Sequence, residues 1–362
     1  MNIFIWMNYP SHHQSYFFES LIKQNVNLKV GYYAEITEDR KNLGWDISVL
    51  NNFEFCVKEN EIDLFINDYS NFIHIVPGYG SKFTRKLAIK LSQKNINWVH
   101  WSEKSTPGIM WYKSFIVKKW YANLVNKYAL GALAQGVLAE KDFKRWGIKT
   151  EIEHLSYSIE PLSGNIVNSE ILKFKRNRFS FLYLGQLVDR KGIDLLIRAF
   201  SEIKNDQWCL IIVGNGRDKT KLQKLAKKLN INEERLLFYP AVKSTDISSI
   251  INCADIFVLP SRNDGWGVVL NEAASLKKPL IASDMVGAAW HLIENYKNGY
   301  RFQSGNYKDL KCQLEKYTSE KKSIDEHGLY SNYLFDKYSS ESMAKNLIKI
   351  FEKWLNVNKI NG

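Results

Sequence analysis

Two carboxylates stand eight positions apart, at Asp264 and Glu272, on either side of the loop Gly265-Trp266-Gly267-Val268. The loop follows an apolar run, residues 256–259, that is typical of a buried strand. Glycines let backbone amides approach a ligand, and Glu272 falls about a turn and a half into the expected helix. The spacing therefore indicates a site for an elongated polyhydroxyl ligand that meets one carboxylate at each end. The structural alternative is that Asp264 favours the helix dipole while Glu272 lies on the helix surface.

Two earlier loops offer positive charge and closely approaching backbone. Gly185 ends an apolar run, and Arg190 and Lys191 follow before the next amphipathic segment, an arrangement suited to a diphosphate. The next apolar run ends in Gly214-Asn215-Gly216, which is half of a dinucleotide-binding fingerprint because Lys219 takes the place of the third glycine. This departure disfavours a Rossmann oxidoreductase. Alternatively, the first loop is a β-turn whose basic side chains face water, and Gly214 and Gly216 form a tight turn with close helix packing.

The elements that must position these loops follow a regular pattern, in which short apolar runs rich in β-formers alternate with longer amphipathic segments. Parallel β-α units have this pattern, and they bind ligands at the carboxyl ends of their strands. We expect strands at residues 2–7, 28–33, 63–67, 72–76, 97–101, 132–139, 179–184, 208–213, 235–239, 255–259 and 279–283. The pattern begins again at residue 179, after a linker expected at 156–178. The pattern predicts domains at 1–160 and 161–340, with a C-terminal helix, 341–362, that packs back on the first domain.

The composition narrows the class of protein. A chain of 362 residues, with 45% apolar and 14% aromatic residues, is long enough for two domains and is neither disordered nor fibrous. The cysteines form no Cys-x-x-Cys pair, so we expect reduced thiols in a cytoplasmic protein. The sequence contains neither a secretory signal nor an apolar run of about 18 residues, so membrane contact should be peripheral. The net charge of +12 indicates an anionic partner, whether nucleic acid, a phosphorylated small molecule or lipid.

The order of the motifs resembles the C-terminal half of family-4 glycosyltransferases, which are retaining enzymes of the GT-B fold that use nucleotide-activated sugars. The resemblance covers about residues 179–303 and includes the run Ala254–Ser261 between the glycine loops and Asp264. It implies an α/β protein with two Rossmann-like β/α/β domains that face a central cleft. The first domain would bind the acceptor and the second the nucleotide-sugar.

Carried over position by position, the resemblance implies that Lys191 contacts the donor diphosphate, Glu272 holds the nucleotide ribose and Asp264 contacts the transferred sugar. The amides of residues 265–268 would lie close to the sugar and the phosphates. The donor-binding set is therefore Gly185, Arg190, Lys191, Gly214, Gly216, Gly265, Trp266, Gly267, Val268 and Glu272.

Three departures from the family pattern bear on donor preference. The basic residue that usually follows the first glycine is Gln186 here, and Arg190 is a candidate substitute. Asp264 is one methylene shorter than the usual Glu. The loop after residue 283, which ordinarily carries two adjacent glycines, reads Gly287-Ala288-Ala289-Trp290-His291.

The first half carries candidate residues for the acceptor and for catalysis. The stretch Pro10-Ser11-His12-His13-Gln14 resembles a subset of surface-polysaccharide glycosyltransferases, which makes His12 and His13 acceptor-side candidates. Many relatives place a histidine or carboxylate near the end of the strand expected at 97–101, so His100 and Glu103 join Asp264 as catalytic candidates. The alternatives are that His12 and His13 cap a helix and that His100 is a core residue. The resemblance implies front-face attack by an acceptor hydroxyl, in which catalysis rests on positioning and on stabilising phosphate charge.

Residues 110–128 mix bulky aromatics with lysines and contain no acidic residue. Such a composition is typical of a helix in a membrane interface, here with Trp111, Lys118, Lys119 and Trp120 as the membrane-facing candidates. The alternatives are an ordinary amphipathic helix whose aromatics pack on the sheet and, without any supporting motif, nucleic-acid binding.

The sequence as a whole predicts a retaining glycosyltransferase that extends a lipid-linked precursor or a surface glycan of the polysaccharide or lipopolysaccharide type. We expect it in the cytoplasm, peripherally bound to the inner face of the cell membrane. The chain has no Asp-x-Asp motif, so a metal cofactor is not expected. Two alternatives are transfer to a soluble acceptor and a GT-B-like nucleotide-binding module without turnover.

Overall fold

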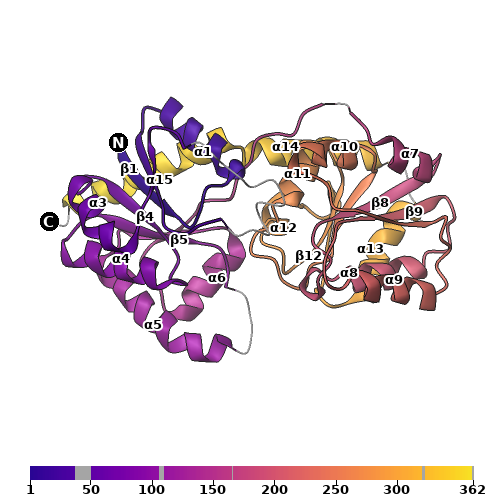
Figure 1. Ribbon diagram of the computed structural model, residues 1–362, viewed down its shortest axis with the longest axis horizontal. Coiled ribbons are helices and arrows are strands. Elements are labelled where there is room, and N and C mark those ends of the chain that lie inside the picture. Colours follow the sequence, from indigo (N-terminus) through magenta and orange to yellow (C-terminus); the bar gives the residue numbers. More distant parts are fainter. Residues whose placement is uncertain (37–49, 106–109, 165, 320–322, 361–362) are drawn as a thin grey trace. The chain divides into compact units, whose positions relative to one another are not determined.

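The computed structural model describes every residue except 37–49, 106–109, 165, 320–322 and 361–362 (Figure 1). The chain divides into two compact units. Unit 1 consists of Met1–Glu160 with Tyr338–Gly362, and unit 2 is Pro161–Lys337. Each unit is built on its own parallel sheet, which confirms the expected α/β class.

The sheet of unit 1 has seven strands in the order β3-β2-β1-β4-β5-β6-β7, and every pairing between them is parallel. The strands are β1 (Asn2–Met7), β2 (Asn27–Tyr32), β3 (Glu54–Cys56), β4 (Ile73–Pro77), β5 (Trp98–Ser102), β6 (Gly131–Ala134) and β7 (Ile152–His154). The helices are α1 (His12–Lys23), α3 (Ile62–Asp68), α4 (Lys82–Gln93), α5 (Met110–Tyr128), α6 (Val137–Trp146) and α15 (Ser340–Ile360).

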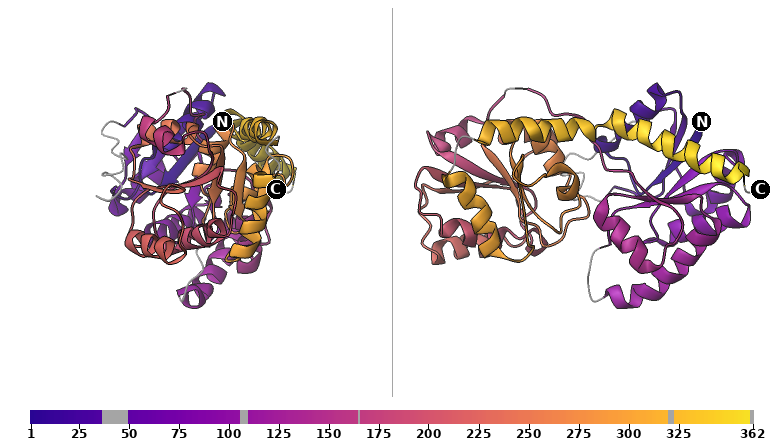
Figure 2. Two further views of the ribbon diagram at one scale, coloured as in Figure 1. Left: turned by 90° about the vertical axis from the view of Figure 1, so that its right-hand side faces the viewer. Right: turned by 180° about the vertical axis from the view of Figure 1, so that it is seen from behind.

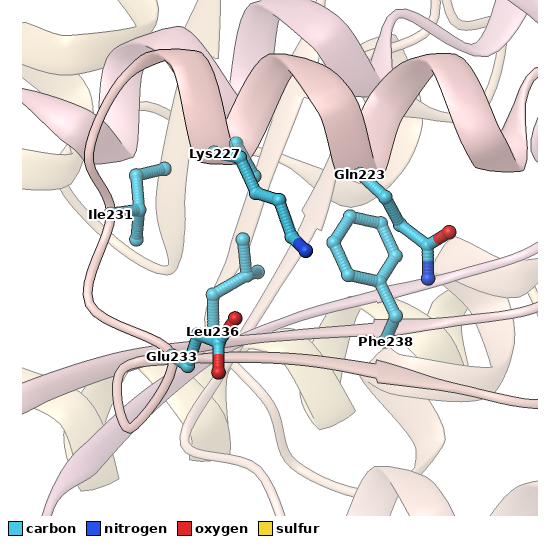
Figure 3. A pocket seen from close by; sticks show the side chains of 7 residues that line it. Gln223, Lys227, Ile231, Glu233, Leu236 and Phe238 are labelled. Atoms are coloured by element: carbon cyan, nitrogen blue, oxygen red, sulfur yellow. The ribbon is translucent and has the colours of Figure 1, made fainter.

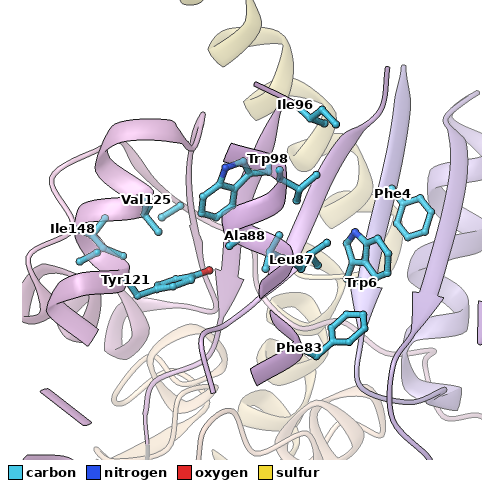
Figure 4. Packing of buried hydrophobic residues seen from close by; sticks show 14 of the residues in the cluster. Phe4, Trp6, Phe83, Leu87, Ala88, Ile96, Trp98, Tyr121, Val125 and Ile148 are labelled. Atoms are coloured by element: carbon cyan, nitrogen blue, oxygen red, sulfur yellow. The ribbon is translucent and has the colours of Figure 1, made fainter. Parts of the chain in front are cut away.

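Both faces of this sheet are buried, because successive residues of β1 enter two different cores. Phe4 and Trp6 join the core beneath α3, α4, α5 and α6, and Figure 4 shows Leu87 beside Trp6, with Trp98 and Tyr121 further along the same core. Ile3 and Ile5 enter the opposite core, which α1 and α15 cover. The C-terminal helix α15 lies beside α1 there (Figure 2), so it completes unit 1 although it follows unit 2 in the chain.

Unit 2 has a six-stranded parallel sheet in the order β10-β9-β8-β11-β12-β13. Its strands are β8 (Phe179–Leu184), β9 (Trp208–Val213), β10 (Leu236–Tyr239), β11 (Ile256–Leu259), β12 (Leu280–Ser283) and β13 (Gly299–Phe302). Its helices are α7 (Ser169–Lys175), α8 (Ile193–Ser201), α9 (Lys219–Lys228), α10 (Ile247–Asn252), α11 (Val269–Ser275), α12 (Ala289–Leu292), α13 (Tyr307–Ser319) and α14 (Ile324–Lys337). The order changes direction at β8 and β11, and parallel sheets bind ligands at such a switch point.

One expected strand is wrong, and another, 132–139, is too long, because β6 ends at Ala134 and α6 begins at Val137. Residues 63–67 form most of helix α3 rather than a strand. Ile62 and Ile66 are the buried residues of this helix, and their separation of four positions places them on one helical face. A short apolar run does not by itself distinguish a helix from a strand.

The expected linker also contains regular structure, since α7 lies within 156–178. Among the described residues, none of the helices has the length and hydropathy needed to cross a bilayer.

Candidate functional site

The loops after β8 and β11 meet at the carboxyl edge of the unit 2 sheet. In the β8 loop (residues 185–192), a single 3-10 turn, Asp189–Lys191, carries both basic residues. The Lys191 Nζ lies 2.5 Å from Oδ2 of Asp264 in the β11 loop (residues 260–268), and both side chains are largely buried. Nη1 of the more exposed Arg190 lies 3.7 Å from Oδ1 of the same carboxylate. Two cations thus converge on one anion, and these predicted site residues are neighbours in the fold.

Glu272 is a buried carboxylate on α11. Within the described part of the chain, no group donates a hydrogen bond to this carboxylate. Burial raises the pKa of Glu272 from its ordinary 4.5 to about 7. A buried acceptor of this kind gains most from a ligand that brings hydroxyl donors to it.

Free backbone donors lie between the two carboxylates. Among the described residues, the amides of Gly265, Gly267 and Val268 have no hydrogen-bond acceptor, as expected where a helix begins. Gly267 adopts φ +90°, and a side chain there would approach Val286 to 2.8 Å, so only glycine fits. The β11 loop is held in place by the amide of Asp264, which donates to the Met285 carbonyl at 3.1 Å.

The side chain of Trp266 does not belong to this ligand-facing set. It is 3% exposed, and its Nε1 donates to Asn271 Oδ1 at 2.9 Å. His291 is also buried, with its ring centroid 5.4 Å from that of Trp266. The structure therefore places both aromatic side chains in the packing beneath the loop, where they support its shape.

The glycines after β8 and β9 have a packing role. A side-chain carbon at Gly214 would lie 1.9 Å from the carbonyl oxygen of Gly185, and one at Gly216 would lie 2.3 Å from that of Leu187. A tight turn with close packing, the alternative to ligand binding, thus accounts for Gly214 and Gly216. Because these residues have no side chain, the loops after β8 and β9 can touch. Gln186, in the β8 loop, is exposed.

In unit 1, the structure places His100 in the core. Its side chain is fully buried on β5, with Ser102 Oγ 3.0 Å from Nε2 and the Tyr121 hydroxyl 3.4 Å from Nδ1. Burial lowers the pKa of His100 to about 3. The ring also packs against Phe143, so these contacts favour the core role left open by the sequence over a catalytic one.

The other candidates of unit 1 lie near strand ends. Glu103 is exposed immediately after β5, and His13 is partly exposed in the first turn of α1, whereas the side chain of His12 lies outside the described ones. Tyr157, which the sequence did not single out, lies near these residues: its hydroxyl hydrogen-bonds the side chain of Gln14, the neighbour of His13, and the charge of Glu103 acts on it. Burial, the largest effect, raises the pKa of Tyr157 to about 12.

Helix α5 presents only some of the proposed membrane-facing residues. Trp120 is 44% exposed, Lys119 is exposed, and Ile116, not singled out by the sequence, is 78% exposed. The side chain of Trp111 lies outside the described ones.

The expectation that Lys118 faces a membrane is wrong, because its side chain is 1% exposed and its Nζ donates to Ser105 Oγ at 2.9 Å. Its ammonium lies 5.2 Å from the ring centroid of Trp146, and burial lowers its pKa. Lys118 therefore belongs to the interior of unit 1 and not to the exposed face of α5.

A separate groove of about 430 Å³ lies beside the edge strand β10 (Figure 3). Leu236 and Phe238 form one wall, Gln223 and Lys227 of α9 form another, and Ile231 and Glu233 close one end. Because β10 begins at Leu236, this closed end lies at the amino end of the strand, away from the glycine loops. The groove is therefore distinct from the candidate site.

No metal site was predicted. Among the described residues, no group of three or more His, Cys, Asp or Glu side chains is placed to hold a metal ion.

Comparison with known proteins finds a family match that lies within unit 2. Residues 166–332 match the family Glycosyl transferases group 1. An uncharacterized glycosyltransferase of Haemophilus influenzae is 24% identical over 311 residues, which cover 85% of this chain and 79% of that protein. The capsular polysaccharide biosynthesis glycosyltransferase CapM of Staphylococcus aureus is 24% identical over 199 residues, 54% of this chain and 51% of CapM. The chain thus spans about half the length of CapM.

The fold is similar to that of a solved structure over nearly the whole chain. The crystal structure of Anabaena HepE in complex with UDP superposes with a TM-score of 0.74 and 15% identity, over 97% of this chain and 99% of HepE. At this identity the likeness concerns the fold alone, and it extends to both parallel-sheet units.

Proposed function

We propose that this chain, which has the GT-B fold and whose residues 166–332 match the family Glycosyl transferases group 1, is a glycosyltransferase that binds a nucleotide-sugar in unit 2. The observation that carries this proposal is the convergence of Lys191 and Arg190 on Asp264, beside free amides and the unpartnered Glu272. The cations and amides suit a diphosphate, and the two carboxylates suit hydroxyl groups on either side of it.

Each residue then has a distinct role in donor binding. The Lys191 ammonium leaves Asp264 and pairs with the diphosphate. Arg190 supplies the second positive charge, because Gln186 stands where the family usually has a basic residue. Glu272 accepts hydrogen bonds from the ribose, and Asp264 accepts them from the sugar. UDP is the first nucleotide to test, because HepE is described in complex with it.

We propose a retaining transfer without an enzymatic nucleophile. The acceptor hydroxyl attacks the anomeric carbon on the face that the diphosphate leaves. As the bond from the anomeric carbon to the phosphate oxygen breaks, the hydroxyl proton passes to that leaving oxygen. Lys191, Arg190 and the loop amides stabilise the negative charge that develops on the diphosphate. Because these groups supply positive charge where it is needed, we expect activity to persist in the presence of EDTA.

The acceptor is proposed to bind unit 1 at the carboxyl ends of its strands. Tyr157, Gln14 and Glu103 gather there, and His13 lies in the adjoining first turn of α1. CapM and its role in capsular polysaccharide biosynthesis support a glycan of the surface-polysaccharide type as the acceptor class.

We further propose a peripheral location at the inner face of the cell membrane, where a lipid-linked acceptor would be found. Ile116, Lys119 and Trp120 form an exposed apolar and basic surface on α5 that suits an interface rich in anionic lipid.

A donor panel tests the enzyme. The full chain is incubated with UDP-, GDP- and TDP-sugars, and release of the nucleotide and binding of the free nucleotide are both measured. We expect one base to be preferred, with release that falls at least about a hundredfold in Lys191→Ala. Nucleotide binding without any release or transfer would favour the non-catalytic module, and neither binding nor release with any donor would refute the proposal.

A further inference from the structure

Arg262 connects the two loops that form the candidate site. It belongs to the β11 loop, two positions before Asp264, and its guanidinium forms a fork with the Asp194 carboxylate at 2.8 and 2.7 Å. The same Nη1 also donates to the Asp189 carbonyl at 2.7 Å. The backbone amide of Arg262 donates to the Arg190 carbonyl at 2.8 Å. Arg262 therefore holds three successive parts of the segment that carries Lys191.

The contacts of Arg262 restrain a turn that has little structure of its own. The turn Asp189–Lys191 is three residues long, and Gly192 follows it in the left-handed conformation at φ +66°. Asp194 lies in the first turn of α8, immediately beyond. The side chains of Arg190 and Lys191 are long and flexible, so the direction in which they point depends on the backbone of the turn. Arg262 restrains this backbone through contacts before and after Lys191.

Arg262 also balances charge beside the site. Asp194 and Asp189 are two carboxylates within one helical turn of Lys191, and Arg262 lies 2.7 Å from the first and 3.6 Å from the second. Without the guanidinium, both negative charges would act on any anion held by Arg190 and Lys191.

We propose that Arg262 is a positioning residue for the diphosphate of the donor. Arg262 acts through the Asp189–Lys191 turn. It fixes the backbone that orients Arg190 and Lys191, and it neutralises the charges of Asp189 and Asp194. This inference rests on the proposed function, since it assigns a role toward the same donor.

The experiment compares nucleoside diphosphates with the matching monophosphates. Calorimetry on the full chain first finds which of UDP, GDP, ADP and TDP binds the unsubstituted protein most tightly. The ratio of the monophosphate Kd to the diphosphate Kd then measures how well the outer phosphate is held, largely independently of the base and the ribose.

We expect Arg262→Ala to lower this ratio about tenfold, mainly by weakening diphosphate binding. Arg262→Lys keeps the charge and loses the fork, so the ratio should fall only about threefold. Arg235→Ala is the matched control, because Arg235 also donates to three carbonyls, those of Ile203, Asn205 and Trp208, but at the other end of the sheet. It should lower the melting temperature and leave the ratio unchanged.

The possible results separate the two proposals. If the unsubstituted protein binds no diphosphate more tightly than its monophosphate, the proposed donor site itself fails. If it does, and both Arg262 variants keep the original ratio, the positioning role is refuted while the donor site stands. An equal fall in Arg235→Ala would also refute it, because the effect would then be general destabilisation. Should Arg262→Ala not fold, Arg262→Lys alone decides.

Discussion

The buried Glu272 carboxylate should make the protein less stable as the pH rises, and Glu272→Gln should remove that loss. Burial raises its pKa in the folded protein to about 7 from 4.5. The stability associated with the protonated form is complete below about pH 4.5 and is lost as the pH rises through 7. The reason is that the unfolded chain ionises freely, while the folded chain must ionise a desolvated group.

The size of this effect follows from the two pKa values. At pH 8 the ionised Glu272 costs about 3 kcal/mol of unfolding free energy, whereas at pH 5 the cost is about 1 kcal/mol. Glutamine has nearly the same shape and cannot ionise. We therefore expect Glu272→Gln to gain about 2 kcal/mol relative to the unsubstituted protein between pH 5 and pH 8, which corresponds to roughly 4–8 °C in melting temperature for a unit of this size.

The assay is urea or thermal unfolding without nucleotide at pH 5, 6.5 and 8, with the same substitution at exposed Glu233 as the control for losing one charge. Any hydrogen bond that the glutamine makes or loses contributes equally at each pH, so only the pH dependence is interpreted. A difference between Glu272→Gln and the unsubstituted protein that is constant from pH 5 to pH 8 would show that the carboxylate is not held unpaired in the folded state. The same variant should bind nucleotide weakly, because the amide offers the ribose hydroxyls one acceptor oxygen without charge.

Three further predictions concern the remaining proposals. Asp264→Asn should tighten nucleoside diphosphate binding about tenfold, because Lys191 loses the anion that competes with the diphosphate. The same variant should reduce sugar transfer at least about a hundredfold. Weaker diphosphate binding by calorimetry would contradict the pairing of Lys191 with Asp264. Trp120→Ala should weaken sedimentation with anionic liposomes about tenfold, whereas Tyr333→Ala, another exposed aromatic but on unit 2, should not; equal effects would argue against a specific role of α5. Tyr157→Phe should raise the acceptor KM about fivefold and leave nucleotide Kd unchanged, and a change in nucleotide Kd alone would place Tyr157 outside the acceptor site.

Much of the fold follows from local patterns in the sequence. The alternation of apolar runs and amphipathic segments is enough to identify two parallel α/β units, because each strand of a sheet covered on both faces must be apolar throughout. The carboxyl ends of parallel strands share one edge, so the order of the strands along the chain is enough to predict that the loops at Gly185, Gly214 and Asp264 meet. The strand expected at 63–67 is wrong, because an apolar run this short fits the period of a helix as well as that of a strand. For the same reason the strand expected at 132–139 extends too far, into α6.

What the tertiary structure alone decided is which polar residues remain accessible and which of them pair. Lys118 and Lys119 are adjacent and chemically identical, yet only the first is buried, because the helix turns it toward Ser105 and Trp146. His100 lies in β5, near the strand end where a catalytic residue would be expected, but Tyr121 of α5 and Phe143 of α6 pack against its ring.

The Arg262–Asp194 fork has no signature in the sequence, since its partners are 68 positions apart. The sequence by itself determined the types of residue and the sheet edge to which they come, because these depend on local periodicity. Burial and pairing depend on contacts between segments that are far apart in the chain, and only the folded structure brings those segments together.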